Sequence, residues 1–567
     1  MTAHPERAPA PPAADAPLRP DVVLVRPRDY GAVPEGAPVQ DPLGVGYLAA
    51  YLRAKGYSVR VLDAHALDLD NDGLVACVVQ LSPRLMGLSL HSFADYAHCV
   101  AISQGVRAAR PSLYCVWGGE HATFHAENIL NQHAEVDAVV LGEGEAALAD
   151  LLAALPSAPP RDGDRLELAT PVAGVLARGS GEALLHGGFR AAIEDLDAQP
   201  EPHKDIVEMA LHAGKAVSVS VLTGRGCTHQ CRFCTAHEFL RLGGGRVWRR
   251  RSPTRVVDEV ERLAATYLTK DLAHPVMQFQ DVIFLGTSTA SRRWAMEFVE
   301  EMERRHLTVP FYCMSRADAI IANRDMLPRL VGVGLWSIEM GIESGVDRIL
   351  KRYDKQNSSD ANTQAIALMR AFGITYDASG FIMFDPSMSL AELRDNAHYL
   401  RDFGAATWDF FVTRLQLYPG TELRAEMIQK GLFRGGNEIG RTCGYSFEDP
   451  LVERVAEFTS YYDPCIRELD LILRDAKAEV AIAHRRGVPC RDDIATGIDL
   501  IHSTYCNHLL GLIDAVAEGA SETDIASLIA AFVQRTSRLA AVMKEILRHP
   551  HVIAPAPVEA MRVSMAQ

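Results

Sequence analysis

Two series of apolar segments alternate with amphipathic helical stretches along this 567-residue chain, and the alternation limits the folds it can adopt. In the first series we expect strands at 21–27, 58–64, 85–90, 113–119 and 136–145. Apolar residues at helical spacing fill the intervals, as in 42–57 and near 95–109. Strand–helix alternation of this length predicts a parallel sheet with helices on both faces, whose ligand crevice lies at the carboxyl ends of the strands.

The second series starts at residue 216 and predicts a barrel. We expect its strands at 217–227, 276–284, 309–318, 336–344, 374–384 and 408–417, with a helix at 253–267. Six β/α units suggest an incomplete TIM-like barrel, whose active residues belong where strands run into the following loops. After YPGTEL (418–423) the strand signals stop, and the remaining pattern is helical.

The length of the chain predicts several domains, because 567 residues are too many for one hydrophobic core. We expect an α/β protein in which the first sheet resembles the flavodoxin-like, doubly wound Rossmann fold. The expected parts are a disordered tail (1–19), the Rossmann-like domain (20–155), a linker with a small hairpin (156–215), a partial (β/α)6 barrel (216–424) and a helical C-terminal domain (425–567).

Charge and composition exclude some classes of function. The formal net charge of −15 argues against nucleic acid as a partner, because phosphate binding needs a basic surface. One basic segment, RVWRRRSP (246–253), is interpreted as a solvated turn before a helix, although a local basic patch stays possible. We find no apolar run long enough to span a bilayer and no secretory signal in the first twenty residues, so we expect a cytoplasmic protein. We also expect a monomer.

Three cysteines crowd into the stretch GRGCTHQCRFC, at Cys227, Cys231 and Cys234, while the other eight are scattered. Thiols stay reduced in the cytoplasm, so metal or redox chemistry explains the cluster better than disulfides do. A zinc site usually takes four ligands in paired modules, and no second pair is nearby. Three thiolates can hold three irons of a cuboidal iron–sulfur cluster, which leaves the fourth iron open for a substrate.

C-x3-C-x2-C after the first strand of a β/α barrel resembles the radical S-adenosylmethionine (SAM) family, and Phe233 before the last cysteine fits that pattern. The resemblance covers about residues 216–423. It implies a [4Fe–4S] cluster whose open iron chelates the amino and carboxylate groups of SAM. It also implies that one electron cleaves the C–S bond of SAM and yields a 5′-deoxyadenosyl radical.

Later segments follow in the order that this resemblance implies for SAM contacts. FQDVIF (279–284) matches the motif after the second strand, SRAD (315–318) ends the third strand and GIESG (341–345) ends the fourth. A serine and an arginine in SRAD suit the SAM carboxylate, through charge-assisted hydrogen bonds. The SAM-binding residues implied are Phe233, Gln280, Asp281, Ser315, Arg316, Glu343, Ser344 and Met383.

A rival pattern lies in the first series. Gly44, Gly46 and Ala49 spell G-x-G-x-x-A, and Asp63 closes the next strand, which imitates a dinucleotide-binding fingerprint. That fingerprint requires the glycines to abut the first strand, so that the pyrophosphate sits at the helix N-terminus. Here a long loop separates the strand, which ends near residue 27, from the glycines, so the pattern argues against NAD.

The motifs ahead of the barrel imply another ligand. PLGVGYLAAYLRAKGYSVRVLDA (42–64), GGEHATF (118–124) and LGEGE (141–145) resemble the cobalamin-binding domain of cobalamin (B12)-dependent, class B methyltransferase-like radical SAM enzymes. Glycines after the fourth and fifth strands let the backbone approach the nucleotide tail of the cofactor. The implied cobalamin-binding residues are Ser89, His91, Ser92, Gly118, Gly119, Glu120, His121, Gly142, Glu143 and Gly144, with His65 as a further candidate. A domain that has kept the fold and lost the ligand is the alternative.

The loop after the first strand departs from many cobalamin proteins. It lacks the D-x-H-x-x-G motif that supplies a histidine ligand, and DAHALD (63–68) follows the second strand and lacks the glycine. We therefore expect base-off cobalamin without a strong histidine ligand on its lower face. A weak lower ligand would favour cycling between low-valent cobalamin and methylcobalamin.

The resemblance favours a methyltransferase that acts on an unactivated carbon of a small molecule, with natural-product or antibiotic biosynthesis as a common role in the subgroup. A flavodoxin- or ferredoxin-like donor would supply electrons. The alternatives are a radical rearrangement, cyclisation or ring contraction without methyl transfer, and a non-catalytic iron–sulfur and cobalamin sensor. Metal binding by His502 and Cys506 on one predicted helix, near Tyr505 and His508, is less favoured than simple helix packing, and Tyr461, Tyr462 and Cys465 are interpreted in the same way.

Overall fold

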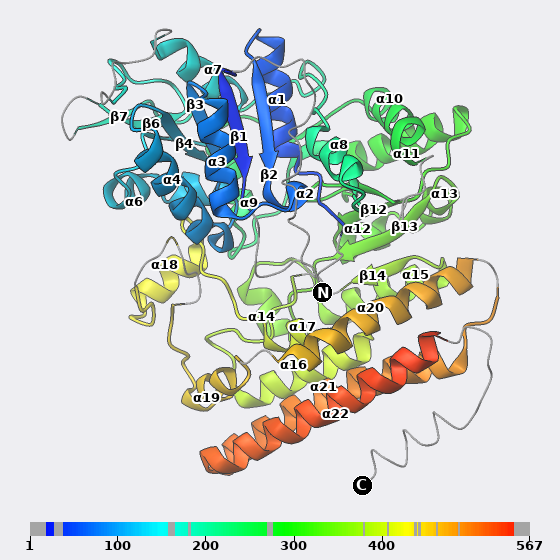
Figure 1. The fold of residues 1–567 in the computed structure, drawn as a ribbon. Coiled ribbons are helices and arrows are strands. Elements are labelled where there is room, and N and C mark those ends of the chain that lie inside the picture. The colour runs from blue at the N-terminus through cyan, green and yellow to red at the C-terminus, as the bar shows by residue number, and fades with distance from the viewer. Residues whose placement is uncertain are drawn as a thin grey trace, which may run out of the picture.

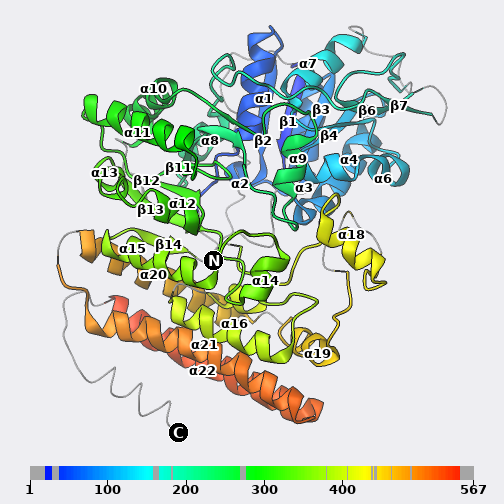
Figure 2. The same ribbon diagram turned by 180° about the vertical axis from the view of Figure 1, so that it is seen from behind.

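A computed structural model describes residues 19–27, 38–156, 165–179, 183–268, 276–377, 380–404, 407–435, 439, 444–460, 463–485 and 488–548. These residues form two parallel sheets with their helices and a layer of long C-terminal helices. The first sheet (blue to cyan) lies beside the second (green), and the C-terminal helices (orange to red) run along one side of the molecule (Figures 1 and 2). The predicted tail, up to residue 18, lies outside the described residues.

The first sheet has the strand order β2-β1-β3-β4-β5-β6-β7. Its five parallel strands lie where the sequence predicts them: β1 (Val22–Arg26), β2 (Val59–Asp63), β3 (Leu85–Ser89), β4 (Tyr114–Gly118) and β5 (Ala138–Val140). Apolar runs such as VVLVR form strands because helices bury both faces of the sheet. The order 2-1-3-4-5 confirms the doubly wound fold and brings the loops after β3, β4 and β5 to one edge.

The helices of this domain are α1 (Leu43–Ala54), α2 (Ala64–Leu67), α3 (Asn71–Leu81), η1 (Phe93–Asp95), α4 (Tyr96–Ala109), α5 (Glu120–Phe124), α6 (Ala126–Gln132) and α7 (Gly144–Ala154). The predicted hairpin is present as β6 (Val175–Arg178) and β7 (Leu184–His186). It does not stand apart as a linker element, because β6 pairs antiparallel with β5 and extends the first sheet. α8 (Asp205–His212) follows and leads into the second sheet.

The second sheet contains five parallel strands in the order β14-β13-β12-β11-β8. They are β8 (Val219–Val221), β11 (Met277–Phe279), β12 (Phe311–Ser315), β13 (Leu335–Met340) and β14 (Thr375–Asp377). A short hairpin of β9 (Gly224–Gly226) and β10 (Trp248–Arg250) follows β8, with α9 (Thr235–Arg241) between its strands. Around the sheet lie α10 (Pro253–Leu263, prolonged by a π-helical turn at Ala264–Leu268), α11 (Thr289–Arg304), α12 (Ala317–Ala322), α13 (Leu327–Gly332), α14 (Asp347–Arg352), α15 (Ser359–Ala371) and α16 (Leu390–Phe403).

The two faces of the second sheet differ in chemistry. Phe279 and Phe311 meet Phe298 of α11 edge to face, at 5.8 and 6.3 Å between ring centroids, so their positions face the outer helices. Because side chains alternate along a strand, Gln278 and Tyr312, which pair in register, face the inside of the curved sheet. The inside is therefore polar and only partly covered, as in a barrel that receives a ligand.

The predicted strand at 408–417 is wrong in its first half. Trp408–Val412 forms helix α17, and within the described part of the chain the residues after it make one bridge, between Arg414 and Phe384. Trp408 and Phe411 stack three positions apart on one helix face, and Trp408 also packs against Phe532 of the C-terminal layer. Burial of these rings against long helices outweighs the strand propensity of the run WDFFV.

The predicted helical C-terminal part consists of α18 (Glu422–Gln429), α19 (Pro450–Phe458), α20 (Pro464–Arg485), α21 (Asp492–Ala517) and α22 (Glu522–Arg548). By length and composition α22 could cross a membrane, so the expectation that no apolar run is long enough is wrong. In the described structure, however, α22 packs against α20 and α21. The ring of Phe532 on α22 stacks on His508 of α21, with 3.9 Å between the centroids.

Helix packing also accounts for the polar cluster on α21. The hydroxyl of Tyr505 donates to Asp470 at 2.9 Å, and the thiol of Cys506 donates to the carbonyl of Ala397 at 3.5 Å. His502 is buried. The packing interpretation is thus confirmed for this helix, while Tyr461 and Tyr462 lie outside the described residues.

Candidate functional site

The cysteine loop is held between the strands of the β9–β10 hairpin. Cys227 follows β9 directly, and its N–H donates to the carbonyl of Val247 at 3.1 Å. Gly226 has φ 112°, and a Cβ there would collide with the same carbonyl, so the residue before the first cysteine must be glycine. Cys234 caps the N-terminus of α9. The loop is thus fixed at both ends.

The three thiols fit the role of cluster ligands. All three are free and half-buried. Burial raises the pKa of Cys234 to about 11, although two backbone amides of α9 oppose the shift. No three His, Cys, Asp or Glu side chains among the described residues converge on a point that could hold a single metal ion. A cuboidal cluster does not require this convergence, because each thiolate binds a different iron.

A cation stands beside these thiols, and the residue before it in the chain carries a buried hydroxyl. Arg316 lies at the end of β12, with its Nη1 3.7 Å from the Sγ of Cys231 and its Nε 3.0 Å from Asp318. Ser315 is buried, and its Oγ has no hydrogen-bond partner. A guanidinium held beside the cysteine loop is a favourable place for a carboxylate. This is the observation that makes the site fit SAM.

A buried ion pair forms the next part of the site. Glu343 has a left-handed backbone (φ 64°), and Lys355 Nζ donates to its Oε1 at 2.5 Å. A Cβ at Gly380 would lie 2.8 Å from Glu343 Oε2, so that glycine leaves room for the carboxylate. Strained non-glycine backbone of this kind gathers at functional sites. Lys355 was missed by the sequence reasoning, because no motif surrounds it and only the fold brings it to Glu343.

Phe233 packs on one side of this ion pair. Its ring meets Tyr353 edge to face at 5.2 Å between centroids, and Lys355 Nζ lies 6.0 Å from the ring centre. The aromatic residue before the last cysteine therefore connects the cysteine loop to the Glu343–Lys355 pair.

Four other predicted SAM residues are engaged within the protein. Asp281 is buried and accepts from the N–H and hydroxyl of Thr223, at 3.1 and 2.6 Å, so it anchors the chain just before β9. The hydroxyl of Ser344 donates to Asn396 at 2.9 Å. The amide of Gln280 donates to Ser220 at 2.9 Å. Met383 is fully buried. These four side chains are buried or hydrogen-bonded within the protein, and SAM contacts from them stay a prediction.

The predicted cobalamin residues line the edge at the carboxyl ends of β3, β4 and β5. His91 is exposed, Ser92 caps η1 and His121 is buried. The remaining members are half-buried: Ser89, Gly118, Gly119, Glu120, Gly142, Glu143 and Gly144. Gly119 has φ 108°, and a Cβ there would lie 2.7 Å from the carbonyl of Leu90, so the protein itself requires this glycine. Gly142 (φ 74°) faces open space.

Two buried histidines follow β4. The Nε2 of His121 lies 2.6 Å from the carbonyl of Ile439, and the rings of His121 and His125 are 4.6 Å apart. Burial, with a smaller effect of His121, lowers the pKa of His125 to about 3, so this imidazole is neutral near pH 7. Burial also lowers the pKa of His121. His65 lies apart from them in α2, and its carbonyl accepts from Lys215. Its approach to cobalt stays a prediction.

The basic segment 246–253 is not the solvated turn that the sequence suggested. It forms β10 and the start of α10, and Arg249 and Arg251 are buried. Arg251 pairs with Glu259 at 2.5 Å, and Arg249 pairs with Glu143 at 2.8 Å. The expectation of a solvated turn is wrong because buried carboxylates pair with these arginines. An arginine side chain can be buried when its charge is paired and hydrogen-bonded.

The two candidate sites meet where α5 packs against α9. Helix α5 carries the EHATF part of GGEHATF, and α9 follows the cysteine loop. The rings of Phe124 and Phe239 lie 6.4 Å apart between centroids, and Gly420 lies against Phe124. The helix after β4 of the first sheet is therefore in direct contact with the helix that follows the cysteine loop.

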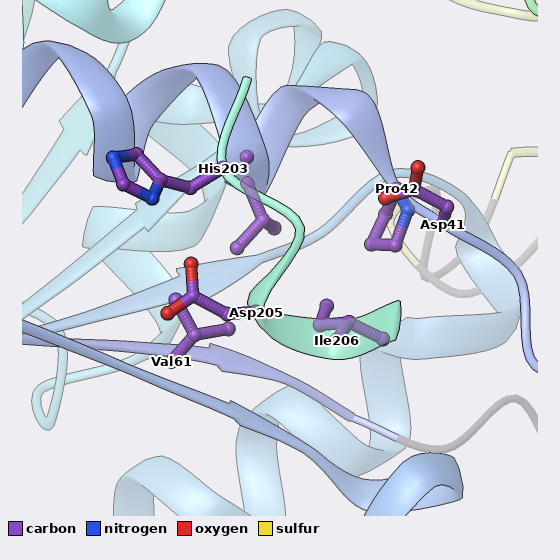
Figure 3. Close-up of a pocket in the computed structure, with 8 residues that line it drawn as sticks. Asp41, Pro42, Val61, His203, Asp205 and Ile206 are labelled. Carbon is purple, nitrogen blue, oxygen red and sulfur yellow. The ribbon is translucent and has the colours of Figure 1, made fainter. Parts of the chain in front are cut away.

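Figure 3 shows a pocket at the start of α1, lined by Asp41, Pro42, Val45, Gly46, Val61, His203, Asp205 and Ile206. The chain at residue 203 crosses α1 closely here: a Cβ at Gly46 would lie 2.7 Å from the carbonyl of His203. The second glycine of the G-x-G-x-x-A pattern thus serves packing of the chain, which supports the sequence argument against a dinucleotide site.

A cysteine loop after the first barrel strand, beside a doubly wound domain, defines a radical SAM barrel joined to a cofactor-binding α/β domain. Family profiles agree: the B12 binding domain matches residues 35–152, and the radical SAM superfamily matches residues 221–400. The chain belongs to the cobalamin-dependent radical SAM enzymes. Its cofactors are accordingly a [4Fe–4S] cluster, SAM and cobalamin.

Individual proteins show the same relationship. The chain is 27% identical over 416 residues to the anaerobic magnesium-protoporphyrin IX monomethyl ester cyclase of Rubrivivax gelatinosus, covering 72% of this chain and 70% of that one. It is 25% identical over 439 residues to the cytidylyl-2-hydroxyethylphosphonate methyltransferase of Streptomyces wedmorensis, covering 69% and 78%. The solved structure of the cobalamin-dependent SAM radical enzyme OxsB matches with a TM-score of 0.67 at 17% identity, over 96% of this chain and 84% of that one, which shows a shared fold.

Proposed function

We propose that this protein is a cobalamin-dependent radical SAM methyltransferase that acts on an unactivated carbon of a small molecule. The packing of α5 on α9 carries the proposal, because it joins the predicted cobalamin edge to the helix that directly follows the cysteine loop. When bound, the cluster would supply the electron that cleaves SAM, and cobalamin would supply the methyl group that is transferred. A methyltransferase among the relatives supports this choice.

The residues of the chain orient and shield these groups. We assign the SAM carboxylate to Arg316 and the free hydroxyl of Ser315. We assign the ribose hydroxyls to Glu343, whose carboxylate Lys355 holds in place. The apolar packing of Phe124 on Phe239 excludes water at one side of the site, which protects reactive carbon radicals.

The inside of the barrel supports a small substrate with polar groups. Gln278 and Tyr312 form one inward layer, and Glu339 stands one layer nearer the carboxyl ends of the strands. All three are half-buried. The Oε1 of Gln416 is buried without a hydrogen-bond partner. A substrate hydroxyl or amine is the group that such acceptors would bind.

Further parts of the proposal concern context. We propose the domain division 20–155, 216–424 and 425–567, in which the segment 156–215 adds its hairpin to the sheet of the first domain and the helical part closes the substrate side of the barrel. A flavodoxin- or ferredoxin-like donor would supply electrons to a monomeric, cytoplasmic enzyme. Natural-product or antibiotic biosynthesis is the proposed setting.

A second candidate is a radical cyclisation or ring contraction without methyl transfer. The relationship to the anaerobic protoporphyrin ester cyclase favours it. Both candidates use the same cofactors and the same SAM contacts, so product analysis has to separate them.

The test is anaerobic reconstitution with iron, sulfide and cobalamin, followed by reduction with SAM that carries a deuterated methyl group and a panel of small acceptors. A product that contains the deuterated methyl supports methyl transfer. A product with the mass of the acceptor, or of its dehydrogenated form, supports rearrangement or cyclisation. If no 5′-deoxyadenosine forms with any acceptor, a non-catalytic sensor is the better account.

A further inference from the structure

We infer that Glu143 is a positioning residue that clamps the loop after β5 to the hairpin carrying the cysteine loop, and that it is not a cobalamin ligand. The inference goes beyond the proposed function, because it concerns the relative position of two cofactor sites in any reaction that uses both. It also replaces the sequence-based expectation that Glu143 hydrogen-bonds to cobalamin.

Both carboxylate oxygens of Glu143 are occupied by the protein. Oε1 accepts from Arg249 Nη2 at 2.8 Å and lies 3.1 Å from Arg225 Nη1. Oε2 accepts from Arg249 Nη1 at 3.0 Å and from the N–H of Ile193 at 2.8 Å. The Arg249 pair is therefore bidentate, which fixes direction as well as distance. Few acceptor sites remain for a cofactor.

The two arginines belong to the hairpin that holds the cysteine loop. Arg225 on β9 and Arg249 on β10 are directly paired in register. Arg225 stands two positions before Cys227 and has a second carboxylate partner, Glu145, at 2.6 Å. Glu143 thus touches both strands of the hairpin, and one rigid connection joins the loop after β5 to the cysteine loop.

The charges in this clamp are balanced and withdrawn from water. The side chain of Arg249 is 1% exposed and that of Glu143 13% exposed. Hydrogen bonds from Arg249 and the charge of Arg225 hold the pKa of Glu143 below its usual value, against the effect of burial. A buried, hydrogen-bonded ion pair adds little net stability but tolerates little displacement of its partners. This pair therefore fixes the position of the loop after β5 relative to the β9–β10 hairpin. A reaction in which two cofactors act on one substrate depends on such positioning.

Two variants and a control test the inference. Glu143→Gln removes the charge and keeps the size of the side chain. The double variant Glu143→Met/Arg249→Met removes both charges, so no unpaired buried charge remains to unfold the protein. Glu194→Gln is the control, because Glu194 pairs with Arg246 of the same region at 2.8 Å in an exposed pair that should contribute little.

Two readouts are measured on the full-length protein reconstituted with its cluster: amide hydrogen exchange over residues 141–148 and 224–250, and the dissociation constant for cobalamin. We expect exchange in the β9–β10 hairpin to rise about tenfold in both clamp variants, while cobalamin affinity changes less than about threefold. The control should match the unaltered protein in both readouts.

A cobalamin affinity reduced about tenfold or more in the double variant would overturn the inference, because it would make Glu143 or its partner a ligand. Unchanged exchange in the hairpin in both variants would also overturn it. Neither readout requires turnover, so failure of the proposed methyl transfer would leave this test intact.

Discussion

Arg316 Nη1 lies 3.7 Å from the Sγ of Cys231, so one side chain connects the third strand of the barrel to the middle cysteine of the loop. The guanidinium also pairs with Asp318 and donates to the carbonyl of Lys355. Its position beside the cysteine loop is the structural reason for assigning the SAM carboxylate to this corner.

We predict that Arg316→Lys weakens SAM binding about tenfold and leaves the iron content of the reconstituted protein unchanged. A lysine keeps the charge but loses the planar fork that suits a carboxylate. Titration of the reduced cluster with SAM, followed by electron paramagnetic resonance, measures the affinity. Arg329→Lys, in an exposed pair with Glu303, is the matched control. Equal SAM affinity in the Arg316→Lys and control proteins would remove Arg316 from the site.

We predict that Glu343→Gln lowers the free energy of unfolding by about 3–5 kcal/mol, because it leaves the ammonium of Lys355 buried without its counter-ion. Chemical denaturation of the anaerobic, cluster-free protein measures the change. The double variant Glu343→Gln/Lys355→Met should recover most of the loss, since both charges are then absent. If the double variant is as unstable as the single one, the two side chains do not form an isolated pair.

We predict a pH-dependent stability of the C-terminal helices that originates at Asp470. Burial raises the pKa of this carboxyl to about 7, although the N–H of Trp408 and the hydroxyl of Tyr505 oppose the shift. The folded protein therefore holds this proton more tightly than the unfolded chain, whose pKa is near the ordinary value of 3.8. This contribution to the free energy of unfolding is present at pH 4 and is lost as the pH rises through 7. Its size is about 1–4 kcal/mol.

Asp470→Asn, which cannot titrate, should flatten this dependence between pH 5 and pH 8. Thermal melting of both proteins across that range measures it, with Asp475→Asn on the same helix as the control. A variant that loses stability with rising pH as steeply as the unaltered protein would show that another group titrates.

The sequence predicted what depends on local pattern. Apolar periodicity placed ten strands of the two sheets because each strand buries apolar side chains against helices on at least one face, and the spacing of three cysteines marked the cluster loop. It failed at 408–417, where the apolar run fits a strand or a helix and only the distant Phe532 decides. It also failed for Arg249, whose partner Glu143 is 106 positions away. Long-range ion pairs leave no periodic signal in the chain, so only the fold reveals them.

The central claim is that Cys227, Cys231 and Cys234 hold a cluster with one iron open to SAM. The most direct test is electron paramagnetic resonance of the protein after anaerobic reconstitution with iron and sulfide and reduction, before and after addition of SAM. We predict the signal of a reduced [4Fe–4S] cluster whose shape changes with SAM, and no such signal in the triple Cys→Ala variant. An equal cluster signal in the triple variant, or a signal in the unaltered protein that SAM leaves unchanged, would contradict the account.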